Sequence, residues 1–445
     1  MKRCLQVLLA AVLVVGVWSA FGAKGFAADI KLEMWDDISG EIENKIFEGL
    51  ISEFEQQNNC TIQRTTRPLE DTKAAVMAAA PSGKVADIIL ANNGETMMGP
   101  LVRGGYLVPL DKYAEQFGWT KRLFSPALLA RNRYSADGSV FGGGNLYAIS
   151  WCGEMVGVFY NKALLKKAGL ALPQSLKEFE AALEKLKAAG ETPLAFGNKD
   201  RWPIFHVYGE VEHALVSAYE GREYLDKLIM NWAADVNWES KSTIEGAQIV
   251  QNWVKKGYFT EGFAGIGYDD SVAMFAAGQG AMMIAGSWIM NVLNASPNEF
   301  GFFPFPPVDP AKGMALQVGG VRTPFGVTTT SKNQELAVKL LDYLMVSPNA
   351  QKLFLEQKLL PAAVPVDLAA IQPGTLFYDL LKTWNDVNAS NNVGHYLDWT
   401  TPTFFDTLGA ASQEMLALRI TPAEFAAKLQ ADYQQWLKDK PQPKK

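Results

Sequence analysis

Residues 144–173 read GNLYAISWCGEMVGVFYNKALLKKAGLALP and contain a turn, an extended stretch, a short basic helix and a proline. Apolar residues alternate from Leu146 to Phe159, which predicts a strand. The run KALLKKA favours a helix, and Gly169 stands at the position of its C-cap. Ser175 is placed to cap the helix that follows the proline. The stretch therefore predicts a strand followed by two helices.

This stretch resembles the crossing segment of the extracellular solute-binding proteins of carbohydrate ABC importers, where the chain first passes between two lobes. Ser150 stands where proline is usual in that family. Three later stretches resemble further parts of the same family in the same order: VAMFAAGQGAMMIAGSW at 272–288, FGFFPFPP at 300–307, and residues 319–333. The residues that match the first crossing are Tyr147, Ala148, Tyr160, Asn161, Lys162, the run 166–170 and Pro173.

The resemblance implies an α/β fold with two lobes, of the type II periplasmic-binding-protein class. Each lobe is expected to be a mostly parallel sheet flanked by helices, and three segments are expected to cross between the lobes. Strands alternating with helices before residue 92 agree with a parallel α/β layer. The expected division is a signal peptide at 1–28, a first lobe at 29–149 and 287–329, and a second lobe at 150–286 and 330–445.

The N-terminus has the pattern of an export signal. Lys2 and Arg3 precede the apolar run 5–17, and small residues at 27–28 offer a cleavage site. Cys4 lies before the apolar run, so it cannot be the lipid-modified cysteine of a lipoprotein. We therefore expect a soluble periplasmic protein, with a retained N-terminal anchor as the alternative.

The composition favours a soluble protein that binds neither nucleic acid nor a membrane surface. The formal net charge is -6, and 20% of the residues are charged, whereas those two partners need a basic face. Three histidines make a zinc site improbable. We expect Cys60 and Cys152 to be unpaired, and the chain to act as a monomer without a metal or another cofactor.

A sugar site pairs aromatic rings, which stack on the C–H faces of the sugar, with planar polar groups for its hydroxyls. The loops after the first and third strands and the crossing stretch supply such residues, and the resemblance places Trp288 at the wall of the cleft. Several have an alternative structural role: the tryptophans can pack between elements, the carboxylates of 36, 37 and 269 can cap helices, the asparagines can form turns, a lone histidine is more often structural, and 395–399 can be a surface loop. The candidates are Trp35, Asp36, Asp37, Asn92, Asn93, Glu95, Trp151, Glu154, Trp202, His206, Asp269, Trp288, Gly320, Arg322, Asp398 and Trp399.

The first functional hypothesis is a non-catalytic receptor that closes two lobes on a sugar and delivers it to an ABC transporter permease. The second is a secreted glycan-acting enzyme that uses Asp36 or Asp37 together with Glu154 as paired carboxylates. A third keeps the fold but changes the partner to a membrane sensor, or the ligand to another polar solute such as a polyamine or a phosphodiester.

Overall fold

The computed structural model describes residues 30–122, 125–361 and 363–442, so the expected signal peptide lies outside the described residues. The strands are β1 Ile30–Asp36, β2 Cys60–Thr66, β3 Ile88–Leu90, β4 Arg133–Tyr134, β5 Asn145–Leu146, β6 Ile149–Asn161, β7 Met282–Gly286, β8 Phe300–Phe303 and β9 Gly319–Val327. The α-helices are α1 Glu41–Asn58, α2 Leu69–Ala79, α3 Met98–Arg103, α4 Asp111–Phe117, α5 Trp119–Arg122, α6 Pro126–Ala130, α7 Lys162–Lys167, α8 Leu176–Ala188, α9 Pro203–Tyr219, α10 Arg222–Asp226, α11 Lys241–Lys255, α12 Tyr268–Ala276, α13 Met290–Asn294, α14 Gln334–Val346, α15 Pro348–Glu356, α16 Leu376–Ala389, α17 Phe404–Leu416 and α18 Pro422–Asp439.

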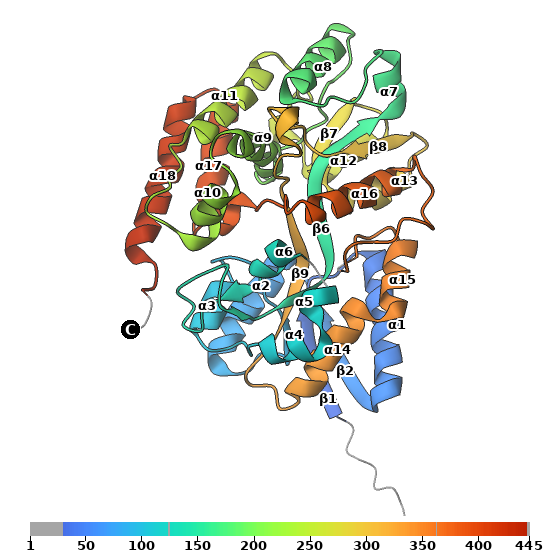
Figure 1. Cartoon of the computed structure of the whole chain (residues 1–445), viewed down its shortest axis with the longest axis vertical. Coiled ribbons are helices and arrows are strands. Elements are labelled where there is room, and N and C mark those ends of the chain that lie inside the picture. The colour runs from blue at the N-terminus through green and yellow to red at the C-terminus, as the bar shows by residue number, and fades with distance from the viewer. Residues whose placement is uncertain (1–29, 123–124, 362, 443–445) are drawn as a thin grey trace, which may run out of the picture.

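Strand β6 joins the two halves of the molecule. Its residues 149–155 pair with β9, and its residues 156–161 pair with β7 and β8. The main sheet therefore has the order β2-β1-β3-β9-β6-β7, with β8 also on β6. Figure 1 shows β6 passing between the lower half, which holds β1 and β2, and the upper half, which holds β7 and β8. The stretch at 144–173 thus forms the predicted crossing strand.

The predicted α/β class is confirmed by the alternation of strands and helices in the first half. Parallel pairing joins β1 to β2 and β1 to β3. In contrast, β9 pairs antiparallel with β3 and β6, and β6 pairs antiparallel with β7 and β8. The expectation of mostly parallel pairing is therefore wrong for β6 to β9, because the chain returns along the same strand β6 that carried it across.

The lower half has its core between β1 and the helix that follows it. Leu32 and Met34 of β1 are buried against Phe47 and Leu50 of α1, as the helical spacing of the apolar residues in α1 predicts. Helices α14 and α15 pack on the same helix α1, as Figure 1 shows. These two helices therefore lie in the lower half with α1, whereas the sequence-based division placed residues 330–445 with the second lobe.

The upper half is organised around α9, which packs against α11 and α17, while α18 covers both α11 and α17. Helix α9 is buried along almost its whole length. Strand β8 and helix α16 pack together in this half, as Figure 1 shows. The sequence-based division had placed residues 300–303 with the first lobe, but their pairing with the end of β6 brings them into the upper half.

Local signals at the helix ends act as the sequence predicts. Ser175 accepts a hydrogen bond from the backbone N–H of Glu178 at the start of α8, and Asn161 caps α7 in the same way. Cys60 and Cys152 are both free and buried, as expected. Among the helices that the structure describes, none is both long and apolar enough to cross a membrane.

Candidate functional site

Six aromatic rings gather in the upper half, beside the point where β6 crosses. The ring of His206 lies between its neighbours, with centroid distances of 5.2 Å to Trp202, 5.3 Å to Trp288 and 5.9 Å to Tyr396. Tyr268 contacts Trp202 at 4.4 Å, and Tyr396 contacts Trp399 at 5.2 Å. We name these six residues the aromatic cluster: Trp202, His206, Tyr268, Trp288, Tyr396 and Trp399.

Separate elements bring these rings together. Trp202 is the N-cap of α9, Tyr268 begins α12, and Trp399 ends the short helix η6 Leu397–Trp399. Trp288 follows β7, and its indole N–H donates a hydrogen bond of 2.7 Å to the hydroxyl of Tyr268. Gly286 is required there, because an added Cβ would lie 2.0 Å from the ring of Trp288. The cluster therefore depends on contacts between parts of the chain that are far apart in sequence.

The strands next to the cluster contribute polar groups. Glu154 of β6 pairs with Gly320 of β9, so the two positions share one face of the sheet. At Gly320 an added Cβ would meet the rings of Trp399 at 3.1 Å and Tyr396 at 3.2 Å, so glycine lets these rings approach the strand. Arg322 lies two residues further along β9 and forms an ion pair of 3.2 Å with Glu43.

Three partly buried carboxyl groups, those of Asp37, Glu154 and Asp398, make no ion pair among the described residues; we name them the three site carboxyls. Asp37 accepts a hydrogen bond of 2.9 Å from the hydroxyl of Thr323. Burial raises the pKa of Asp37, raises that of Glu154 to about 7 and raises that of Asp398 to about 6. Near neutral pH they therefore offer both hydrogen-bond acceptors and, where protonated, donors.

The side chain of His206 is buried, and burial lowers its pKa to about 3, so the imidazole is neutral. Its Nδ1 atom has no hydrogen-bond partner among the described residues. The hydroxyl of Tyr396 is also buried. It lies beside the carboxyl of Glu154 and lowers the pKa of that carboxyl, but the two groups do not meet in good hydrogen-bond geometry. Buried polar atoms without partners are costly, so a ligand hydroxyl or a water that bonds to these two groups would stabilise the site.

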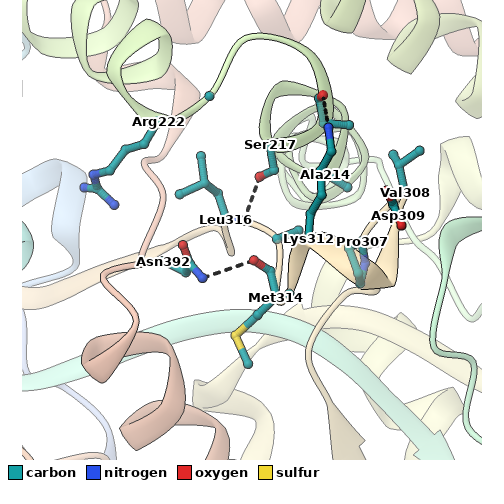
Figure 2. A pocket seen from close by; sticks show the side chains of 14 residues that line it. Ala214, Ser217, Arg222, Pro307, Val308, Asp309, Lys312, Met314, Leu316 and Asn392 are labelled. Carbon is teal, nitrogen blue, oxygen red and sulfur yellow. Dashed lines mark hydrogen bonds between the residues drawn. The ribbon is translucent and has the colours of Figure 1, made fainter.

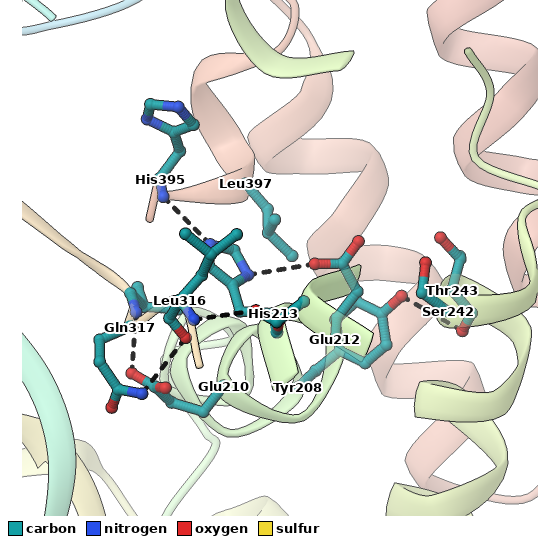
Figure 3. A network of polar contacts seen from close by, with 12 residues as sticks. Tyr208, Glu210, Glu212, His213, Ser242, Thr243, Leu316, Gln317, His395 and Leu397 are labelled. Atoms are coloured by element: carbon teal, nitrogen blue, oxygen red, sulfur yellow. Dashed lines mark hydrogen bonds and ion pairs between the residues drawn. The ribbon is translucent and has the colours of Figure 1, made fainter. Parts of the chain in front are cut away.

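A buried polar network supports the segment that carries Tyr396, Asp398 and Trp399 (Figure 3). The backbone N–H of His395 donates to Nε2 of His213 at 3.0 Å. The Nδ1 atom of the same ring lies 3.1 Å from a carboxylate oxygen of Glu212. His395 Nε2 in turn lies 2.6 Å from Asp226. The network fixes where the segment meets α9.

The lower half reaches the same segment through Arg131, which follows α6. Its guanidinium donates to the carbonyls of Val393 and Gly394 and lies 5.8 Å from the ring centroid of Trp399. Burial lowers the pKa of Arg131 to about 9. Arg131 therefore links the two halves through backbone carbonyls beside the aromatic cluster.

Trp151, Asp36 and Trp35 have structural surroundings. Trp151 is fully buried and contacts Phe47 and Phe354 edge-on at 5.0 and 5.4 Å. Asp36 is fully buried and pairs with Arg64 through two hydrogen bonds of 2.6 and 2.8 Å. Trp35 lies under the guanidinium of Arg67 at 5.1 Å. We therefore leave these three out of the proposed site.

The loop after β3 is also engaged in structural contacts. Asn93 is buried and donates to the carbonyl of Arg131 and to Asn132 at 2.8 and 2.7 Å. Glu95 is buried, with an ion pair of 2.7 Å to Arg103. Asn92 is only partly buried, at the start of that loop. Asp269 is exposed in the first turn of α12, where a carboxylate favours the helix dipole.

Sequence reasoning missed Tyr268, Tyr396 and Arg131. Tyr396 lies within the run HYLDW, whose aromatic residues and aspartate were the available signal. Tyr268 and Arg131 stand in no recognisable pattern, and only the long-range contacts of Trp288 and Trp399 reveal them. The spacing of Trp151 and Glu154 in the sequence argues against Trp151 as a site residue. Side chains three residues apart on a strand point to opposite faces of the sheet, and Glu154 is one of the site carboxyls.

A cavity of about 190 Å³ lies elsewhere, between the end of α9 and residues 307–316 (Figure 2). Its polar side chains are already engaged: Lys312 donates to the carbonyl of Ala218 at 2.9 Å, and Asn392 donates to the carbonyl of Met314 at 3.1 Å. None of the aromatic cluster lines it. We therefore place the candidate site at the aromatic cluster, where unpartnered polar groups and rings occur together.

The described residues contain no group of three or more His, Cys, Asp or Glu side chains that could hold a metal ion. The arrangement offers flat rings next to carboxyl, hydroxyl and imidazole groups. It is suited to a ligand that has both apolar faces and hydroxyl edges.

The model of a family described as bacterial extracellular solute-binding protein matches residues 39–352. The maltodextrin-binding protein MdxE of Bacillus subtilis is 22% identical over 366 residues, covering 81% of each chain. The multiple sugar-binding protein of Streptococcus mutans is 22% identical over 309 residues, covering 68% of this chain and 69% of that protein.

Solved structures share the fold. A chitin oligosaccharide binding protein superposes with a TM-score of 0.75 at 20% identity, covering 92% of this chain and 99% of the other. The binding protein RafE in complex with raffinose superposes with a TM-score of 0.70 at 17% identity, covering 91% and 99%.

Proposed function

This chain belongs to the bacterial extracellular solute-binding protein family, and on that premise we propose that it captures a sugar or oligosaccharide and delivers it to the membrane permease of an ABC importer. The relatives that cover most of the chain include proteins named for binding maltodextrin, multiple sugars and galactooligosaccharide. Membership in a family of binding proteins favours this function over that of a glycan-acting enzyme.

The observation that carries the proposal is the aromatic cluster beside the three site carboxyls. Trp288 is held by Tyr268, and Trp202 and His206 pack beside it. Such rings stack on the C–H faces of a sugar, while carboxyl groups bind its hydroxyls. We assign Asp37, Glu154, Trp202, His206, Trp288, Asp398 and Trp399 to ligand binding, and we add Tyr268 and Tyr396.

We propose that capture is a hinge motion of two lobes about β6 and β9. Asp37 comes from the loop after β1 in the lower half, whereas the aromatic cluster belongs to the upper half. A ligand that contacts both sets favours the closed state, because only that state provides all of its contacts. We place α14 and α15 with the first lobe, and β7, β8 and α16 to α18 with the second.

We also propose that the protein is exported to the periplasm and acts there as a monomer beside its permease. The N-terminal export pattern supports the location, and the family description supports an extracellular role.

A thermal-shift screen against neutral mono- and oligosaccharides tests the sugar proposal, since a ligand that binds only the folded state raises the melting temperature by mass action. A saturable rise with at least one sugar supports it. The same mixtures, analysed for cleavage products after prolonged incubation, test the enzyme alternative. Release of shorter glycans, abolished by Glu154→Gln, would instead establish paired-carboxylate chemistry.

A further inference from the structure

The ring of Trp399 is held by both halves of the molecule. From the upper half, Tyr396 contacts it with ring centroids 5.2 Å apart. From the lower half, the guanidinium of Arg131 lies 5.8 Å from the ring centroid, and Gly94 lies directly against the same residue. An added Cβ at Gly94 would come within 3.0 Å of the Cβ and 3.1 Å of the Cα of Trp399. The position of this ring therefore depends on groups that its own half does not supply.

Arg131 is a buried cation that reaches the segment before Trp399 through backbone carbonyls. Its side chain is fully buried. It donates to the carbonyl of Ala127 in its own helix at 2.8 Å, and to the carbonyls of Val393 at 3.3 Å and of Gly394 in the other half. Its Nε atom has no hydrogen-bond partner among the described residues. Burying a cation in this way costs free energy, so packing alone does not account for an arginine at this position.

The backbone on each side of this contact is fixed within its own half. In the lower half, Asn93 donates to the carbonyl of Arg131 at 2.8 Å. In the upper half, the N–H of Gly394 donates to the carbonyl of Gln317 at 2.6 Å, and the N–H of His395 enters the buried network of Figure 3. A motion that separates the halves must therefore break or lengthen the bond from Arg131 to Gly394.

We propose that Arg131 is a positioning residue for sugar binding, which sets Trp399 in place for the ligand only while the two halves are together. This inference rests on the proposed sugar binding and hinge motion. It gives the lower half a second part in binding, because closure then orders a ring of the upper half in addition to bringing Asp37 to the ligand. A ring that the protein already holds costs the ligand less ordering entropy. Loss of Arg131 should therefore weaken binding through Trp399.

A double-mutant cycle on sugar affinity tests this role. The probes for calorimetry are maltotriose, raffinose, xylotriose and N,N′-diacetylchitobiose, and the tightest binder is used throughout. Arg131→Met keeps a buried stem and removes the donors, and we expect it to weaken the affinity by at least about tenfold. In a Trp399→Ala background the same change should cost less than about threefold, because the ring that Arg131 positions is gone. In a Trp288→Ala background it should again cost about tenfold, since independent sites contribute additively.

Further variants separate positioning from a general loss of stability. Arg133→Met removes an arginine two residues further along, whose partners Asp111 and Gly144 belong to the lower half. It should change the affinity by less than about twofold. Arg131→Lys keeps a donor and the charge but not the planar fork, so it should recover only part of the affinity. Melting temperatures establish that each variant is folded, and Trp399→Phe replaces Trp399→Ala if the latter is not.

Fluorine NMR of protein labelled with fluorotryptophan follows the same ring without a ligand. The resonance that is missing in Trp399→Phe belongs to Trp399. It should shift or broaden in Arg131→Lys, and because this variant keeps the positive charge, the change reports a ring that has moved. The resonance of Trp119, whose indole N–H donates to Asp342 at 2.8 Å in the lower half, should stay as it is.

The outcomes distinguish the two proposals. No loss of affinity in Arg131→Met, an equal loss with and without the ring of Trp399, or an unchanged Trp399 resonance overturns the positioning role and leaves sugar binding intact. If none of the sugars binds the unmodified protein, the sugar function itself fails and the role of Arg131 in sugar binding falls with it. The fluorine resonance still shows in that case whether Arg131 places the ring.

Discussion

The indole N–H of Trp288 donates a 2.7 Å hydrogen bond to the hydroxyl of Tyr268, which lies 20 residues earlier in the chain. This bond fixes the plane of the indole ring. Trp202 packs against Tyr268 as well, with ring centroids 4.4 Å apart. Two tryptophans are thus held at set angles, and a rigid ring costs a ligand little conformational entropy on binding.

The first prediction concerns this pair. Trp288→Ala should weaken sugar binding by at least about tenfold, because it removes both stacking area and the shape of the cluster. Tyr268→Phe should have a smaller effect, since the ring stays and only its hydroxyl is lost. Calorimetry provides both affinities. The control is Trp436→Ala, at a tryptophan that is also partly buried but lies on α18. An equal loss of sugar affinity in this variant would show that Trp288 has no special role in binding.

The second prediction separates Trp151 from the site. Trp151→Ala should lower the free energy of unfolding by about 3–5 kcal/mol, as expected for a large buried ring, because it packs between Phe47 and Phe354. Urea unfolding measures this loss. The affinity of the folded protein should change by less than about twofold, well below the effect of a lost binding contact; a large affinity loss at unchanged stability would return Trp151 to the site.

The third prediction assigns opposite roles to two adjacent carboxylates. Asp36→Asn should destabilise the fold by about 3–5 kcal/mol, because it leaves the buried guanidinium of Arg64 without its charged partner. Asp37→Asn should leave the free energy of unfolding nearly unchanged, since it removes a carboxyl whose pKa burial already raises. The same variant should weaken sugar binding. Finding these two effects exchanged between the variants would contradict the placement of the carboxyls.

The fourth prediction concerns pH. Burial raises the pKa of Glu154 from 4.5 to about 7 in the folded state, so between these values the folded protein binds more protons than the unfolded chain. Stability therefore falls as pH rises through this range. Compared with Glu154→Gln, the unmodified protein should lose about 1–3 kcal/mol of unfolding free energy between pH 4.5 and pH 8. Urea unfolding at both values gives the difference, and a gain with rising pH would refute the assigned environment.

The fold was largely predictable because its signals are local. The alternation in β6, the apolar stripe of α1 and the cap at Ser175 each lie within a few residues. The pairing direction of β7, β8 and β9 was not predictable, since it depends on which strand the returning chain meets. For the same reason α14 was not expected beside α1.

The site was predictable only in part. Trp288 lies in a recognisable motif, and Glu154 lies in the crossing strand. By contrast, no local pattern tells that Asp36 meets Arg64 from the next strand, or that Glu95 meets Arg103 and Tyr134. A carboxylate in a loop after a strand has the same sequence signal whether it binds a ligand or a neighbouring arginine.

The crystal structure of the protein with the neutral sugar that gives the largest thermal shift tests the central claim most directly. We predict a sugar ring stacked on Trp288 or Trp202, with hydroxyls on Asp37, Glu154 or Asp398. A sugar bound instead in the cavity beside Ser217 and Lys312, with the aromatic cluster empty, would contradict the account.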